Sequence, residues 1–345
     1  MPEAEVKPQH VPRKGNSSKP SAETIDTGLT RQTRSKAQAF KPVGWLAYTA
    51  LFLLTVASYS PIFLSGLAWS DYDQVERSAY QSMELWTESW APEIIRAEDP
   101  LTLSSYFIEQ SIPFALPATH HAINLLLHIT AAILLLKNLE ALKLTTAFSA
   151  ALVFALHPAA MQTIFWSGYR AELIGLILIL AALYFGIKNH NMKDYIMLTV
   201  ICVIAYISHP AALFLPPLLG LCIFYQNESF RFKEYNRLLP LFCLALFFGV
   251  WTQGVSANAE LEWGERFGIS AQSLLFYLKQ ALFPIELALF YPFEQTKGFR
   301  VGAQSNFLPF SLFIPLYALV AIYIRKSWAR GLLLGLTAYL LLLLY

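Results

Sequence analysis

Residues 118–136 read ATHHAINLLLHITAAILLL, nineteen consecutive positions without Asp, Glu, Lys or Arg. An α-helix of about this length crosses the ~30 Å hydrocarbon core of a bilayer. Further apolar runs occupy residues 43–64, 145–165, 171–187, 195–207, 211–225, 238–254, 307–324 and 328–345. The sequence therefore predicts an all-α membrane protein, a polytopic bundle of about nine spans.

The composition of the chain excludes several other classes of protein. Of its 345 residues, 56% are hydrophobic and only 14% are charged, whereas soluble domains carry about 25% charged residues. The net charge of +2, without a basic cluster, does not indicate a nucleic-acid partner. The three cysteines, Cys202, Cys222 and Cys243, lie in apolar runs and are predicted to be small core residues.

Charge asymmetry predicts the orientation of the chain. Residues 1–42 hold eight Lys/Arg and four Asp/Glu, and we expect a disordered tail there, with no signal-peptide cleavage site after it. The tail and the loops on its side of the membrane hold 18 of the 25 Lys/Arg but 8 of the 23 Asp/Glu, which predicts that this side is cytoplasmic. The bundle then covers residues 43–345, with long outer loops at 68–117 and 255–306.

One apolar segment, residues 270–288, is expected not to cross. It contains Lys279, Pro284 and Glu286 within SAQSLLFYLKQALFPIELA. If it crossed, the basic residues at 325–330 would lie outside, against the positive-inside tendency. We therefore predict an amphipathic helix on the outer side.

Polar residues kept within apolar spans are costly and commonly functional. His121, Asn124 and His128 are spaced i, i+3, i+7 and share one helical face. This stripe is expected to face protein or a water-filled cleft rather than lipid. His157 and His209 lie at predicted outward ends of spans.

Two further groups lie near the outer surface. Asp71 and Asp73 open the first outer loop, where they suit a general base, a cation ligand or a solvated loop. Arg170 lies on the less basic side, and its planar cation suits a lipid phosphate or pyrophosphate. The alternative is a surface pair of Arg170 with Glu172, with Trp166 as an interface anchor.

Other chemistries receive less support. Two His on one face with nearby carboxylates suit a redox metal or haem, but no Glu-x-x-His pair occurs in the spans, and a divalent metal is not predicted. Gly-x-Ser-x-Gly and phosphate-loop motifs are absent. A transporter or flippase is disfavoured because no internal repeat is visible and the polar groups gather on one side.

The run from His120 to His128, HHAINLLLH, resembles the second helix of GT-C membrane glycosyltransferases. The branch most similar contains the transmembrane, tetratricopeptide-containing O-mannosyltransferases and related bacterial enzymes. Other elements of that branch follow the same order between Pro61 and Pro292. They are the acidic pair 71/73, DPLT at 99–102, FALHP at 154–158, GYRAEL at 168–173, YLKQALFP at 277–284 and FYP at 290–292.

The chain also departs from that pattern. Asp99 stands where the branch has Arg, with Arg96 three residues earlier, and Tyr169 splits the Gly-Arg pair. Ser208-His209-Pro210 replaces Ser-Lys-Glu, and no tetratricopeptide repeats occur. These differences keep open a second interpretation, a catalytically inactive accessory subunit of a membrane complex.

The resemblance implies a bundle in a bacterial inner membrane with an active cleft on its outer face. It implies inverting transfer of a sugar from a polyprenyl phosphate to a protein, glycan or lipid acceptor, with no certain resident cofactor. Asp71, then Asp73, would be the general base, and Arg170, with Lys279 and Arg96 as second choices, would bind the donor phosphate. The cleft would be lined by His121, Asn124, His128, His157, Trp166, Glu172, His209 and Tyr291.

Overall fold

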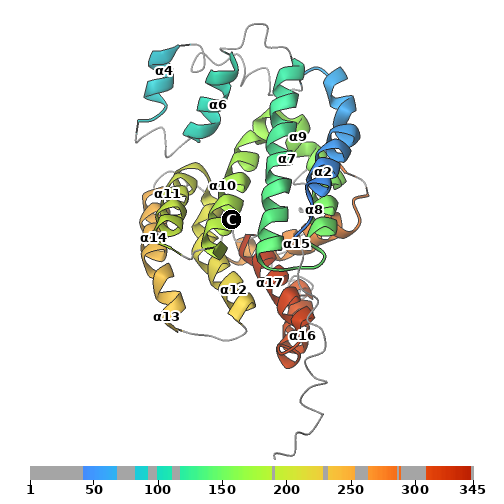
Figure 1. The fold of residues 1–345 in the computed structure, drawn as a ribbon, viewed down its shortest axis with the longest axis vertical. Helices are drawn as coiled ribbons and strands as arrows, with labels where there is room; N and C mark the ends of the chain where they lie inside the picture. The colour runs from blue at the N-terminus through green and yellow to red at the C-terminus, as the bar shows by residue number, and fades with distance from the viewer. Residues whose placement is uncertain are drawn as a thin grey trace, which may run out of the picture. The chain divides into compact units, whose positions relative to one another are not determined.

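α-Helices occupy all nine segments in which the sequence predicts spans (Figure 1). The structure is a computed structural model that describes residues 42–67, 82–91, 99–110, 117–188, 191–227, 232–252, 263–285, 287–288 and 308–342. Within these ranges the regular secondary structure is entirely helical. Residues Pro42–Tyr345 belong to one compact unit. The predicted N-terminal tail lies almost wholly outside the described residues.

The helices over the predicted spans are often joined to short 3₁₀ turns. They are α2 (Trp45–Tyr59) with η1 (Ser60–Leu64), α7 (Pro117–Ala141), α8 (Ala147–Leu156) with η3 (Pro158–Ala160) and α9 (Met161–Phe165), α10 (Arg170–Lys188), α11 (Met192–Ser208), η5 (Pro210–Phe214) with α12 (Leu215–Asn227), η6 (Asn236–Leu238) with α14 (Leu239–Thr252), α16 (Leu308–Ile322) and α17 (Ser327–Leu342). The other described elements are α4 (Met83–Glu88), α6 (Pro100–Gln110), η4 (Ser167–Tyr169), α13 (Phe232–Tyr235) and α15 (Trp263–Leu282).

Four helical segments are long and apolar enough to cross a membrane: Trp45–Leu64, Pro117–Ala141, Arg170–Lys188 and Pro210–Asn227. The pair Ala147–Leu156 and Pro158–Phe165 adds a fifth if it is counted as one span. The apolar helices at Asn236–Thr252, Phe313–Ile322 and Trp328–Leu342 are shorter. Length and composition thus support a membrane protein with four or five candidate spans among the described residues.

The third predicted span is not the continuous helix that the sequence suggested. It bends by 49° between α8 and the η3–α9 segment. Pro158 begins η3 and has no backbone N–H, so the α-helical hydrogen-bond ladder cannot continue through it. The bend leaves backbone groups that need side-chain partners, and α7 supplies several of these.

Small residues allow the central helices to pack closely. One core cluster joins α10, α11, η5, α12 and α14 and includes Ala182, Ala205 and Ala212, all completely buried. Large apolar side chains such as Ile196, Leu246 and Val250 are exposed on α11 and α14. Exposed apolar surface of this kind is what lipid tails would cover.

The cysteine prediction is correct at two positions and wrong at the third. Cys202 and Cys222 are buried, whereas Cys243 is exposed. Cys243 belongs to α14, which also exposes Phe242 and Phe247. The apolar run containing Cys243 therefore reflects an outward apolar face as well as a core-facing one.

The segment at residues 270–288, predicted to be an amphipathic helix, is helical, but over different bounds. α15 runs from Trp263 to Leu282 and ends before Pro284. Although it has 20 residues, it is not among the helices apolar enough to cross. Its C-terminal half is joined to the bundle by two hydrogen bonds: the Tyr339 hydroxyl donates to the Leu274 carbonyl at 2.6 Å, and the His157 ring lies 3.1 Å from the Ala281 carbonyl.

Candidate functional site

The polar stripe of α7 faces protein, as predicted. His121, Asn124 and His128 are all at most 1% exposed. His128 Nε2 lies 3.1 Å from the carbonyl of Ala155, and His121 Nε2 lies 3.3 Å from that of Gly66. These side chains therefore satisfy backbone carbonyls that have no ladder partner, a requirement that is strict in an apolar surrounding.

Asn124 completes this role where α9 ends. Its amide nitrogen donates to the carbonyls of Ile164 and Trp166 at 3.3 and 3.4 Å. Its side-chain oxygen accepts a 2.8 Å hydrogen bond from Arg170 Nε. Asn124 thus links α7, the end of the broken span and the start of α10.

Arg170 lies at the centre of a buried polar cluster. Its side chain is completely buried, and Nη1 contacts Glu109 Oε2 at 2.5 Å and Ser105 Oγ at 3.3 Å. The guanidinium carbon also stacks 4.4 Å from the centre of the Tyr106 ring. The cluster therefore attaches α6 to the first turn of α10.

Glu109 is shared between two basic groups. Its other oxygen, Oε1, lies 2.8 Å from His120 Nδ1, and both side chains are almost completely buried. Burial alone would raise the pKa of Glu109, but the hydrogen bond to His120 and the charge of Arg170 together hold that pKa below its ordinary value. Glu109 is therefore a carboxylate that bridges α7 and α10.

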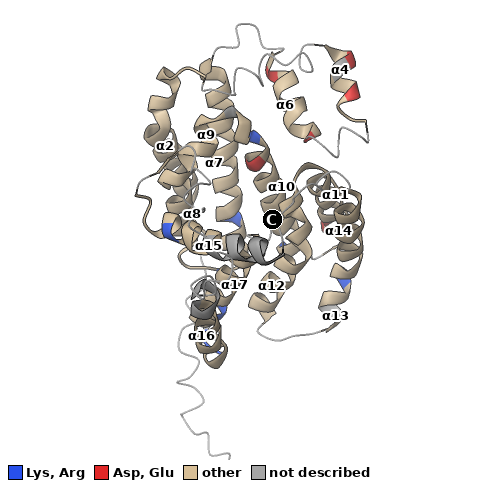
Figure 2. Ribbon diagram, turned by 180° about the vertical axis from the view of Figure 1, so that it is seen from behind, with Lys and Arg blue, Asp and Glu red and all other residues tan. Residues whose placement is uncertain are grey.

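This geometry corrects the alternative of an Arg170–Glu172 surface pair. Arg170 pairs instead with Glu109, because residues two apart on a helix do not face each other. Trp166 is also buried, packing edge-on against Tyr169 with ring centres 4.8 Å apart, so it is not an exposed interface anchor. Figure 2 shows the charged positions as blue and red patches near the start of α10 and red patches on α6.

Glu109 is the main residue that the sequence reasoning missed. It lies within a predicted polar loop, where an acidic residue does not by itself indicate a functional site. The available signal was helical spacing: Ser105, Tyr106 and Glu109 recur at i, i+1, i+4 and share one face of α6. That face meets Arg170, which lies 61 residues away in sequence.

Asp99 has a different role from the Arg that its position would hold in the resembled branch. Its carboxylate accepts hydrogen bonds from the Leu101 backbone N–H at 3.0 Å and from the Thr102 hydroxyl at 2.5 Å. With Pro100 as the first helical residue, this is an N-cap of α6. Burial raises the pKa of Asp99, although the capping hydrogen bonds oppose that rise.

Four of the predicted cleft residues line one cavity of about 700 Å³: His128, His157, Glu172 and His209. We call this the polar cavity. The C-terminal half of α15 contributes Tyr277 and Gln280 to its wall, and the remaining lining is mostly apolar. The cavity thus gathers polar groups from α7, the broken span, α10 and the turn after α11, which are far apart in sequence.

His209 and Glu172 form a defined pair on the wall of the polar cavity. His209 Nδ1 accepts the backbone N–H of Ala211 at 3.3 Å, so the ring proton resides on Nε2. That nitrogen lies 3.0 Å from Glu172 Oε2. The His209 side chain is 7% exposed, whereas that of Glu172 is 42% exposed. The imidazole therefore positions a carboxylate that remains accessible.

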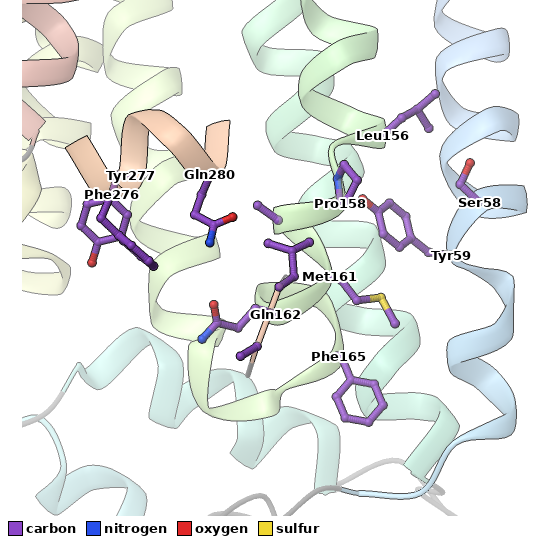
Figure 3. Close-up of a pocket in the computed structure, with 13 residues that line it drawn as sticks. Ser58, Tyr59, Leu156, Pro158, Met161, Gln162, Phe165, Phe276, Tyr277 and Gln280 are labelled. Atoms are coloured by element: carbon purple, nitrogen blue, oxygen red, sulfur yellow. The ribbon is translucent and has the colours of Figure 1, made fainter. Parts of the chain in front are cut away.

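Figure 3 shows a second cavity, of about 680 Å³, which shares lining residues with the first. We call it the apolar cavity after its aromatic and aliphatic side chains, although both cavities have a largely apolar surface. Tyr277 and Gln280 line both cavities, and Tyr59, Phe165 and Phe276 are among the aromatic residues of the second. Its walls come from α2, η3, α9 and α15. An elongated apolar group could lie here with its polar end at the shared wall.

The remaining predicted residues are placed as follows. Lys279 is exposed on α15, and His121, Asn124 and Trp166 are buried but do not line either cavity. Asp71, Asp73, Arg96 and Tyr291 lie outside the described residues. Within the ranges that are described, no group of three or more His, Cys, Asp or Glu is arranged to hold a metal ion.

No protein-family model matches this sequence, and no match is found among curated proteins or solved structures.

Proposed function

We propose that this protein is a polytopic membrane glycosyltransferase of the GT-C type. It would have about nine spans, a cytoplasmic N-terminus and an active cleft on the outer face of a bacterial inner membrane. The donor would be a sugar on a polyprenyl phosphate, and the acceptor a hydroxyl or amide of a protein, glycan or lipid. The neighbouring pair of cavities is the observation on which this proposal depends.

The two cavities suit the two parts of a lipid-linked sugar. The polar cavity offers the carboxylate of Glu172, which accepts hydrogen bonds from hydroxyl groups and is held by His209. The apolar cavity offers aromatic and aliphatic walls of the kind that an isoprenoid chain would contact. Tyr277 and Gln280 lie at the wall between them, where the phosphate joining sugar and lipid would fall.

The proposed chemistry is a single displacement. An acceptor oxygen or nitrogen attacks the anomeric carbon, and its proton passes to the carboxylate of Asp71, with Asp73 as the second candidate. The bond from the anomeric carbon to the phosphate oxygen breaks, and polyprenyl phosphate leaves with the bonding electrons. The new bond forms on the opposite face of the sugar, so the configuration inverts.

A cation near the leaving phosphate would stabilise its charge. Lys279 is exposed on α15 and is one residue from Gln280, but it lines neither cavity, so its long side chain would have to reach the phosphate from outside them. Arg170 is completely buried and bound to Glu109, so binding a phosphate would require that ion pair to break. Arg96 is a further candidate for binding the phosphate.

The test uses the full chain in lipid nanodiscs with polyprenyl phosphates that carry radiolabelled hexoses or pentoses. We expect release of polyprenyl phosphate from at least one donor. Asp71→Asn should lower the rate of this release by a factor of about 10² or more. The control is Asp194→Asn, at the N-terminal turn of α11. The proposal fails if no donor is consumed, or if Asp71→Asn and Asp73→Asn both retain full turnover.

One observation favours the second candidate function, an inactive accessory subunit. The cation that best matched the phosphate in sequence, Arg170, is bound within a structural cluster. A chain that kept the bundle and lost catalysis would preserve that cluster. A wild-type protein that is folded and yet inert with every donor would support this alternative.

A further inference from the structure

The carboxylate of Glu172 occupies an unusual position for a residue in the first turn of α10. Arg170, two residues earlier, points into the buried cluster with α6, whereas Glu172 lies on the wall of the polar cavity. Its side chain is 42% exposed and is the only Asp or Glu that lines this cavity among the described residues. A carboxylate in the first turn of a helix also interacts favourably with the helix dipole.

His209 is held in place from two directions. One is the hydrogen bond to Glu172, and the other is a close approach to Gly175, one turn further along α10. A Cβ added at Gly175 would lie 2.5 Å from His209 Cγ and 2.7 Å from its Cβ. Only a glycine at position 175 leaves room for the ring to pack against the helix, so Gly175 helps to fix the position of His209.

The resulting pair has a definite chemical preference. One oxygen of Glu172 accepts the proton of His209 Nε2, which orients the whole carboxylate toward the cavity. Charged acceptors form the stronger class of hydrogen bond with hydroxyl donors. Gln280 adds an amide group, and Tyr277 adds an aromatic ring on the same lining. Several neutral hydroxyl groups on a compact ring match this arrangement.

We propose that Glu172, positioned by His209, recognises the sugar of the ligand that enters the polar cavity. Glu172 contacts the sugar hydroxyls directly, and His209 is a positioning residue. The inference rests on the proposed function for the identity of the ligand, a sugar on an isoprenoid phosphate. It does not require that the sugar be transferred.

The experiment measures binding rather than turnover. The probes are radiolabelled citronellyl phosphate and its esters with mannose, glucose, galactose or arabinose, and the protein is the full chain in nanodiscs of neutral lipid. For the wild type, at least one sugar-bearing probe is expected to bind more tightly than the sugar-free phosphate. Glu172→Gln should weaken the binding of that probe by roughly ten- to a hundredfold, the loss expected for one charged hydrogen bond. Binding of the sugar-free probe should be unchanged.

The control and the second variants separate recognition from folding. Glu84→Gln changes an exposed carboxylate on α4 and should alter neither probe. Glu172→Asp keeps the charge but shortens the side chain, and it replaces Glu172→Gln if that variant does not fold. His209→Asn should produce a smaller loss, because it loosens Glu172 without removing it.

Each outcome bears on the proposal separately from catalysis. Equal binding of sugar-bearing and sugar-free probes by the wild type overturns the inference, as does full discrimination by folded Glu172 variants. Discrimination that depends on Glu172 in a protein without turnover supports the site and removes the transferase. Turnover by the wild type, together with unchanged sugar affinity in Glu172→Gln, supports the transferase and removes the site.

Discussion

Replacing Glu109 by Gln tests whether the buried cluster holds helix α6 in place. The substitution keeps the shape of the side chain but leaves the Arg170 cation completely buried without an opposite charge. Breaking a buried ion pair costs about 3–5 kcal/mol. Arg170 keeps Asn124, Ser105 and the Tyr106 ring as partners, so we expect a value near the lower limit.

The same loss should appear as undocking of α6 rather than unfolding of the bundle. Among the residues that the structure describes, the buried apolar side chains of α6 form one small cluster, Leu103 with Tyr106. Arg170 also lies at the positive end of the α10 dipole, which adds to the cost of an unpaired cation. About 3 kcal/mol corresponds to roughly a hundredfold rise in the undocked population.

Maleimide labelling of a buried position on α6 measures that population. The reporter is Leu103→Cys, a site that is 6% exposed, in a Cys243→Ser background that removes the exposed native thiol. Glu109→Gln should raise the labelling rate about a hundredfold, whereas Glu88→Gln, an exposed carboxylate on α4, should not change it. The double variant Glu109→Leu/Arg170→Met should restore most of the protection, because it removes both charges together.

The pH dependence has a definite sign. The pKa of Glu109 is lower in the folded protein than its ordinary value, so folding favours the deprotonated form. Its stabilisation is complete above the unfolded pKa of about 4.3 and is lost as the pH falls through the folded value. The docked state of α6 should therefore be more stable in the wild type than in Glu109→Gln by a constant amount at neutral pH. This difference in stability should shrink only in acid. A labelling rate of Glu109→Gln within threefold of the wild-type rate at neutral pH would refute this account.

Two further substitutions test local features of the fold by thermal unfolding in one detergent. Gly175→Ala should destabilise the protein by about 1–3 kcal/mol because the new methyl group meets the His209 ring, whereas Gly335→Ala, which meets nothing within 4 Å, should be neutral or slightly stabilising. Equal melting temperatures for the two variants would contradict the close approach. Asp99→Ala should lower the free energy of unfolding by about 1 kcal/mol because it removes the cap of α6, and Asp99→Asn should recover most of that loss. If Asp99→Asn is as unstable as Asp99→Ala, the charge of Asp99 matters and not its capping hydrogen bonds.

The positions of the helices along the chain were largely predictable from the sequence. Long apolar runs locate helices because backbone groups in an apolar surrounding must bond within the segment. The spacing of His121, Asn124 and His128 similarly predicted one face, and that face is buried. The bend at Pro158 was not predicted, since hydropathy averages over a window and gives little weight to one missing N–H.

The partners of the charged residues were not predictable in the same way. Arg170 and Glu172 are close in sequence, which suggested a pair, yet each binds a residue from another element, Glu109 and His209 respectively. Such pairings depend on which helices become neighbours, and a single sequence carries no direct signal of that. The cavities likewise arise from the placement of α15, whose contacts involve His157 and Tyr339 at large sequence separations.

The first turn of α10 explains why one short motif contributes to both structure and site. Successive residues on a helix are rotated by about 100°, so Arg170 and Glu172 point to nearly opposite sides. One side meets α6 and α7, where Arg170 is neutralised by Glu109 and fixed by Asn124. The other side meets the turn after α11, where His209 orients Glu172 at the polar cavity. Because both contacts begin in the same rigid turn, a change that releases Arg170 should also move Glu172. Glu109→Gln is therefore expected to weaken the binding of sugar-bearing probes although Glu109 lines neither cavity, and unchanged binding in that variant would show that the two sides of α10 act independently.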